Sequence, residues 1–395
     1  MQMTMTTTRG ARRCGWLLAL VLAVVPLAAC VAPQPVVQAQ VMPFEQAAQA
    51  AVDGLLRQGD ESAGLFGAKP RVLVLDPTID GLTGQQTAAT QVLDRIVGQR
   101  VRERGSEALR FDAQGVGKAT HLVVGTMTRA DKAYQLNLAL VDLGSRTVVA
   151  QSSSRASAAG VDMTPLAMFR DSPVLPRDRG FDGYVKTAST APKQPADPAY
   201  LDRLASAAQA QDAMALYAAG RFREALAAYR AAAVRGGDQI RVLTGVYLSA
   251  VKAGTPAEAE EAFGQLVALG LSTNSVSVKF LFAPGSTEFW PDPKVTAAYA
   301  MWMRQIAAQL ARSSLCVRVQ GHTSATGTES FNEALSTRRA ATIRGRLVAL
   351  SPALEPRLRV LGLGSKENIV GTGTDDVVDA ADRRVDFRVV GCEAG

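Results

Sequence analysis

The residues best suited to chemistry lie near the C-terminus, where residues 321–340 read GHTSATGTESFNEALSTRRA. A turn rich in Gly, Ser and Thr leads into a stretch with helical spacing that carries Asn332, Arg338 and Arg339. Where a strand is followed by a helix, the free backbone N–H groups at the start of the helix attract negative charge. The stretch therefore predicts a site that holds a polar ligand.

Catalytic motifs are absent from the sequence. Its two histidines, His121 in a strand-like run and His322 in the turn, are both predicted to be structural. No Cys/His cluster has metal-ligand spacing, and no Walker loop, GxGxxG stretch or GxSxG elbow occurs. His322 and Ser324 lie two positions apart, but no motif supplies an orienting carboxylate or an oxyanion hole. We therefore expect a binding protein that is not an enzyme and uses no metal or cofactor.

The elements that position this turn alternate between strand and helix patterns from residue 275 onward. In chain order they are VSVKFLFAPGST, VTAAYAMWMRQIAAQLA, LCVRVQGHT, NEALSTRRAATIRGRLVAL, LRVLGLGS and RRVDFRVV. Such alternation predicts a two-layer α/β sandwich, here ending in a strand of edge strength.

The motifs of this region resemble the OmpA-like peptidoglycan-binding domain from about Val276 to Val390. They are VKFLFAPGSTEF, VRVQGHTSATG, NEALSTRRA, LGLGS and ADRRVDFRV, in the order and spacing of that family. The resemblance implies that Arg339 pairs with a carboxylate of a diaminopimelate-type stem peptide, which a planar guanidinium grips with two hydrogen bonds. It further implies that Asn332 orients the ligand or the turn, that Ser336 and Thr323 close local hydrogen bonds, and that Arg338 is a solvated charge.

The sequence departs from the family at Ser324, which stands where the family has an aspartate that meets the ammonium end of the ligand. Serine brings no charge, which costs on the order of 1.5 to 3 kcal/mol, or roughly tenfold to a hundredfold in affinity. Three readings remain: weaker binding, recognition of an altered stem peptide, or a domain kept for protein contacts. Glu329 is a candidate to restore the missing charge. Asp382, where Asn is usual, is a milder and structural departure.

Four cysteines occur, and only Cys316 and Cys392 lie in the C-terminal region. An exported chain meets an oxidising compartment, so this pair is a disulfide candidate rather than a metal site. In the resembled sheet their strands are antiparallel neighbours, which implies a disulfide; a pair of free thiols is the alternative.

The N-terminus has the pattern of an export signal. Arg9, Arg12 and Arg13 precede an apolar run of about 15 residues, too short to span a membrane, and small residues lead to Cys30. LAAC resembles the lipobox of bacterial lipoproteins, which implies a signal peptide over 1–29 and fatty acylation, for example with palmitate, of Cys30. Val31 implies retention in the outer membrane. An ordinary secretory peptide is the alternative.

Between the two ends the sequence predicts four segments. Residues 30–43 are a Pro/Gln/Val-rich tether, and residues 44–157 resemble the FlgO/CsgG-type α/β domain, with a helix near 87–103 and an antiparallel meander. The apolar face of that helix is predicted from Ala88, Val92, Ile96 and Val97. Residues 158–199 are predicted to be a Pro-rich linker or an irregular excursion from the first domain. Residues 200–273 resemble a tetratricopeptide-like helical pair with a 34-residue offset.

The whole chain of 395 residues is thus predicted to be a multidomain α/β plus α protein. Its formal net charge of +7 includes three arginines of the leader, so the rest carries +4. No basic run occurs, so nucleic acid is not an expected partner. The expected function is an outer-membrane lipoprotein, periplasmic in bulk, that binds peptidoglycan and meets envelope proteins through its repeat helices. The alternative is a scaffold or assembly protein of an envelope machine that has lost wall binding through Ser324.

Overall fold

The structure, a computed structural model, describes residues 40–62, 71–236, 239–274, 276–283, 285–369, 373 and 382–392. The predicted signal peptide, Cys30 and most of the predicted tether lie outside these residues. Among the described residues, no helix combines the length and the apolar content needed to cross a bilayer.

The N-terminal half is built on a seven-stranded sheet in the order β1-β7-β6-β5-β2-β4, with β3 beside β5. Its strands are β1 (Val41–Met42), β2 (Val72–Leu75), β3 (Ile79–Asp80), β4 (Glu107–Leu109), β5 (His121–Ala130), β6 (Ala133–Asp142) and β7 (Thr147–Ser157). Strands β5, β6 and β7 form the predicted antiparallel meander. Strands β2 and β4 extend it with parallel pairs, and β1, within the predicted tether, pairs parallel with β7.

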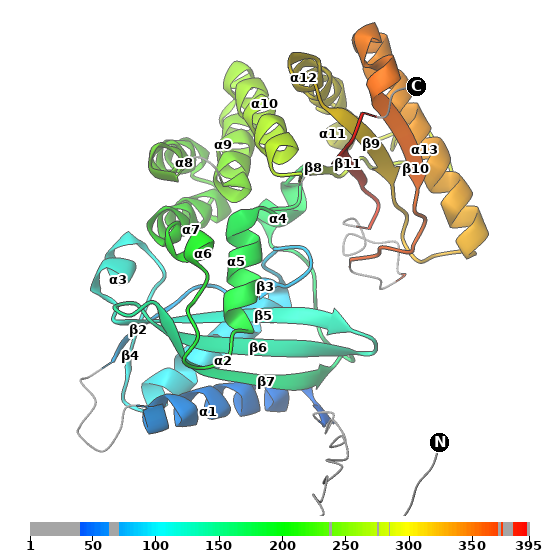
Figure 1. Ribbon diagram of the computed structural model, residues 1–395. Helices are drawn as coiled ribbons and strands as arrows, with labels where there is room; N and C mark the ends of the chain where they lie inside the picture. The colour runs from blue at the N-terminus through cyan, green and yellow to red at the C-terminus, as the bar shows by residue number, and fades with distance from the viewer. Residues whose placement is uncertain are drawn as a thin grey trace, which may run out of the picture. The chain divides into compact units, whose positions relative to one another are not determined.

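Helices cover both faces of this sheet. Figure 1 shows α1 (Phe44–Ser62) and α2 (Ala88–Glu103) on one face and α5 (Arg179–Ala188) on the other, and each face has its own apolar core. Short strand β4 is followed by α3 (Ala113–Lys118). Because strand side chains alternate, neighbours such as Leu73 and Val74 enter opposite cores.

The predicted apolar face of α2 is confirmed at Val97 and wrong by one position at its other three residues. The helix buries Ala89, Leu93, Val97 and Val101, whereas Ala88, Val92 and Ile96 are only partly buried. Residues 89, 93, 97 and 101 and residues 88, 92, 96 and 100 both have helical spacing. The set that begins at residue 88 ends at Arg100, so only the set that begins at residue 89 is apolar to the end of the helix.

The segment 158–199, predicted as a Pro-rich linker, is instead folded against its neighbours. It contains α4 (Ala167–Asp171), α5 and the start of α6 (Pro198–Leu201). Val174 forms a β-bridge with Val278, and the Lys279 N–H donates to the Pro173 carbonyl at 2.8 Å. The sequence signal was misleading because the prolines lie between short helices that bury aromatic side chains.

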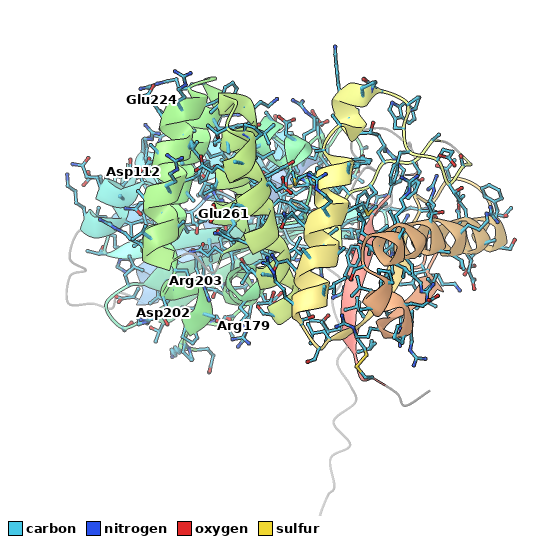
Figure 2. The ribbon with its side chains drawn as sticks, turned by 90° about the horizontal axis from the view of Figure 1, so that it is seen from above. Asp112, Arg179, Asp202, Arg203, Glu224 and Glu261 are labelled. Carbon is cyan, nitrogen blue, oxygen red and sulfur yellow. A yellow bond between two sulfur atoms is a disulfide. The ribbon has the colours of Figure 1, made fainter. Side chains whose placement is uncertain are left out.

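Four helices follow, each packed on the next: α7 (Leu204–Ala218), α8 (Phe222–Gly236), α9 (Ile240–Ala253) and α10 (Pro256–Ser272). Glu224 and Glu261 label α8 and α10 in Figure 2. Three pairs of positions related by the 34-residue offset are equivalent. Tyr229 and Phe263 are both buried, as are Ala225 and Ala259, and Gly220 and Gly254 both have positive φ. A fourth pair differs, because Val251 is exposed where Tyr217 is buried.

The C-terminal sheet has the order β10-β9-β11-β8. Its elements are β8 (Val276–Val278), α11 (Pro293–Thr296), α12 (Tyr299–Arg312), β9 (Cys316–Gly321), α13 (Glu329–Leu350), the 3-10 helix η1 (Pro352–Arg357), β10 (Leu358–Gly362) and β11 (Val385–Val390). The prediction that the last strand is an edge strand is wrong, because β11 pairs with both β9 and β8. Its alternating charges suit an interior position because Asp386 pairs with Arg384 and Arg388.

The C-terminal sheet, α12, α13 and the four-helix array share one apolar core. The Trp302 ring of α12 stacks on Phe263 of α10 with centroids 5.6 Å apart, and its indole N–H donates to the Tyr247 hydroxyl at 2.8 Å. The C-terminal domain therefore shares its apolar core with the helix array, and separating the two would expose aromatic side chains.

Candidate functional site

Helix α13 aligns the predicted binding residues on one face. Its N-cap is Thr328, whose hydroxyl accepts from the Phe331 N–H. Asn332, Ser336 and Arg339 follow at helical spacing and are all buried. Arg338 is exposed. Of the two adjacent arginines, only Arg339 therefore lies on the same buried face as Asn332 and Ser336.

Two glycines let α13 approach the ends of β9 and β10. A Cβ added to Gly321 would lie 2.2 Å from the Ser336 carbonyl oxygen, so any larger residue would push the helix off the strand. Gly364 has φ of +53° and its N–H donates to Ser336 Oγ at 2.9 Å. The Ser336 hydroxyl in turn donates to the Glu333 carbonyl at 2.9 Å. Ser336 therefore closes the local hydrogen bonds expected of it.

The GHT turn is held mainly through its backbone. The Thr323 N–H donates to the Gly364 carbonyl at 2.9 Å, and the Asn332 amide donates to the carbonyls of Ser324 and Thr326 at 3.4 and 3.0 Å. The side-chain amide of Asn368, in the orientation in which both its nitrogen and its oxygen have hydrogen-bond partners, donates to the Thr323 carbonyl at 2.8 Å. Asn332 therefore orients the turn.

The Thr323 side chain does not play the part expected of it. Thr323 Oγ1 is buried and has no hydrogen-bond partner within the described residues. The backbone of this residue makes the local bonds instead. A buried hydroxyl of this kind is the sort of group that a ligand can satisfy.

Arg339 is 4% exposed, and its guanidinium contacts the segment after β8. Its Nε donates to the Ser286 carbonyl at 3.0 Å and its Nη2 to the Ala283 carbonyl at 3.1 Å. The guanidinium carbon lies 4.9 Å from the centre of the Phe282 ring, within the range of a cation–π contact. A carboxylate that takes this edge of the guanidinium must therefore displace two backbone carbonyls.

Ser324 and Glu329 lie in different surroundings. Ser324 is 5% exposed beside Asn332. The Glu329 side chain is 67% exposed and lies 3.8 Å from the Lys366 amine. Glu329 therefore faces solvent and does not restore a buried negative charge next to Ser324.

His322 belongs to a buried ionic cluster that the sequence did not reveal. Its Nε2 lies 3.3 Å from Asp386 Oδ2 without the alignment of a hydrogen bond, and Arg384 Nε lies 3.2 Å from Asp386 Oδ1. Burial alone would raise the pKa of Asp386, but Arg384, His322 and the Ser277 hydroxyl together hold that pKa well below its usual value. The alternating charges in RRVDFRVV are the one sequence feature that could have indicated this cluster.

Cys316 and Cys392 form a disulfide bond, as predicted, with Cα atoms 5.2 Å apart. The register of β11 on β9 places Val390 opposite Cys316, which brings the two cysteines to the same end of the sheet. Asp382, the milder departure, is buried and accepts a hydrogen bond from the Ile369 N–H at 2.5 Å. In the part of the chain that the structure describes, no three His, Cys, Asp or Glu side chains gather as a metal site requires.

These features define a two-layer α/β domain with a buried arginine at the helix that follows its GHT turn. Residues 281–382, about a quarter of the chain, match the OmpA family. The C-terminal region of this protein is therefore an OmpA family domain. A search of curated protein sequences gave no significant match.

Several solved structures are similar to just under a third of the chain. The peptidoglycan-associated lipoprotein from Burkholderia pseudomallei is 24% identical, with 29% of this chain and 89% of that chain covered and a TM-score of 0.25. The cell wall anchor of the T6SS from Pseudomonas aeruginosa is 24% identical over 29% of this chain and 80% of that chain, with a TM-score of 0.24. The periplasmic domain of Helicobacter pylori MotB is 16% identical over 30% and 82%, with a TM-score of 0.25.

Proposed function

We propose that this protein is an outer-membrane lipoprotein that tethers the membrane non-covalently to peptidoglycan through its OmpA family domain. In this proposal Arg339 binds a carboxylate of the diaminopimelate-type stem peptide, Asn332, Ser336 and Thr323 shape the pocket, and Cys30 carries the lipid. The observation that carries the proposal is the gathering of the motif residues on one buried face of α13, against the ends of β9 and β10.

The proposed mechanism is tethering without catalysis or cofactor. Two weak attachments on one chain, lipid to membrane and arginine to wall, reinforce each other because the first raises the effective concentration for the second. Even an affinity lowered by the uncharged Ser324 is then useful. In this proposal, helices α7 to α10 bind envelope proteins in the periplasm.

Removing the Arg339 side chain is expected to weaken peptidoglycan binding roughly tenfold to a hundredfold, because a charge-assisted pair contributes on the order of 1.5 to 3 kcal/mol. We would measure co-sedimentation of residues 31–395, wild type and Arg339→Ala, with purified sacculi. This length is chosen because the domain shares its core with α9 and α10.

Arg338→Ala is the matched control, since it removes the same charge from the adjacent, exposed position. Equal retention of all three proteins, with unchanged circular dichroism, would contradict the role of Arg339. A loss shared by both variants would point to general charge attraction instead.

Restoring the acid with Ser324→Asp is expected to strengthen sacculus binding about tenfold or more if the ligand presents an ammonium group. The same change should lower the stability of the free protein, because position 324 is buried and an unpaired carboxylate there is costly. Thermal unfolding with and without soluble muropeptides would show both effects. Weaker binding together with lower stability would instead favour an altered stem peptide.

A second function, a scaffold or assembly protein of an envelope machine without wall binding, is favoured by one observation. The Arg339 guanidinium is engaged by two carbonyls, and Ser324 offers no charge for an ammonium group. No retention of the wild type on sacculi, with retention gained by Ser324→Asp, would support this alternative over the tether.

A further inference from the structure

A hollow of about 370 Å³ lies where the helix array, the segment 170–173 and the OmpA family domain meet. Residues of α9 form one wall, and residues of α11 and α12 form another. The end of α4 and the segment after β8 complete it, with Lys279 bound to the carbonyls of Phe169 and Arg170. It is separate from the carbonyl contacts of Arg339 described above.

The hollow carries a marked excess of positive charge. The cationic residues that line it are Arg170, Lys252, Lys279, Lys294 and Arg383, and the acidic residue among its lining is Asp171. That carboxylate is already shared, at 3.6 Å from both Arg170 and Lys252 and at 3.0 Å from the Tyr217 hydroxyl. Burial, opposed by Asp171, lowers the pKa of Lys279 to about 8. One carboxylate therefore does not balance the cations, and an anionic group would be attracted there.

The walls between these charges are apolar and aromatic. Tyr247, Tyr299 and Trp302 line the hollow, and the tyrosine and indole rings are fixed by packing and by the Trp302–Tyr247 hydrogen bond. Val251 and Val295, on opposite walls, are 47% and 37% exposed. Rigid aromatic side chains beside exposed aliphatic ones are typical of surfaces that receive a side chain from a partner.

We propose that this hollow binds an acidic peptide segment of a partner protein, in which carboxylates flank one bulky apolar side chain. The apolar side chain rests between Val251 and Val295, and the carboxylates pair with Lys252 and Lys294 at the rim. A hollow of this size suits one or two inserted side chains, which favours a peptide over the flat surface of a membrane. The proposal does not depend on wall binding, because none of the residues proposed to bind the wall lines the hollow.

The test uses residues 31–395 with Trp290→Phe, which leaves Trp302 as the single tryptophan and a reporter inside the hollow. The probe is a synthetic peptide of sequence Glu-Asp-Leu-Glu-Asp, with two controls: one has lysines in place of its acids, the other glycine in place of its leucine. We expect the acidic peptide to change Trp302 emission in a saturable, salt-sensitive way. Both control peptides should bind at least tenfold more weakly.

Lys252→Glu combined with Lys294→Glu should weaken binding of the acidic peptide at least tenfold. Lys132→Glu, at an exposed position in the β5–β6 turn, should leave it unchanged, as should Arg339→Ala. Binding that survives the double reversal, or no binding at all, overturns the proposal. Vesicles of phosphatidylglycerol that bind in place of the peptide, with the same dependence on Lys252 and Lys294, would overturn it in favour of a lipid ligand.

Discussion

Replacing Cys316 and Cys392 together by serine is expected to lower the free energy of unfolding by about 4 to 5 kcal/mol. The disulfide closes a loop between residues 76 positions apart, and in the chain-entropy model a loop of this length restricts the unfolded chain by about that amount. Because β9 ends in the GHT turn, loosening this sheet should also weaken any site on α13. Urea unfolding of residues 31–395, followed by circular dichroism and by the emission of Trp290 and Trp302, measures the change.

Reduction of the wild type provides the control for this experiment. The reduced wild type should unfold at the urea concentration of the double serine variant, and reductant should leave that variant unaffected. If oxidised wild type and variant unfolded together, the disulfide would add nothing to stability. A change confined to the tryptophan emission, which comes from the C-terminal region, would show that the C-terminal sheet unfolds separately from the N-terminal one.

Asp76 is expected to make the protein less stable as the pH rises from 5 to 8. It follows β2, is buried, and accepts a hydrogen bond from the Tyr200 hydroxyl at 2.6 Å. Burial raises its pKa from 3.8 to about 7, an effect that the Tyr200 hydrogen bond only partly opposes. The folded protein therefore keeps a proton that the unfolded chain loses, so stability is present at acidic pH and is lost as the pH rises through 7. From pH 5 to 8 this loss amounts to about 2 to 3 kcal/mol.

Asp76→Asn tests this directly, because the amide keeps an acceptor for Tyr200 but cannot ionise. Urea unfolding at pH 5, 6, 7 and 8 should show the variant gaining about 2 to 3 kcal/mol relative to the wild type across the range. A smaller slope should remain, since burial also raises the pKa of Asp94 to about 6. Asp131→Asn is the control, as Asp131 is exposed in a turn at φ of +55°, which asparagine tolerates. Parallel pH profiles for wild type and Asp76→Asn would contradict the assignment.

Much of the C-terminal domain was predictable because its signals are local. Alternating strand and helix patterns, the turn glycines and the helical spacing of Asn332, Ser336 and Arg339 depend on residues close in sequence, and the structure forms each of them. The resemblance to the OmpA-like domain selected Arg339 over Arg338, and the structure places only Arg339 on the buried face of α13.

The sequence could not show features that depend on distant partners. RRVDFRVV was predicted to be an edge strand, and the partners that its charges find could not be read from the sequence. Asp386 is met by His322 after β9, by Ser277 in β8 and by Arg384 just before β11. No local pattern marks Asp76, yet it is buried and accepts a hydrogen bond from Tyr200, 124 positions away.

By itself, the sequence determined the alternation of strands and helices in the C-terminal region and the OmpA-like motifs, because both depend on residues that lie close together in the chain. Arg339 and the Cys316–Cys392 pair followed from the family that these motifs resemble. Only the tertiary structure decided that Arg339 is held by the carbonyls of Ala283 and Ser286, that Ser324 is buried, and that segment 158–199 is folded rather than a linker. The cationic hollow beside Trp302 also arises only from tertiary packing. The physical reason is the same throughout. Burial and charge balance depend on contacts between residues that are distant in sequence, and local sequence patterns do not show which of these contacts form.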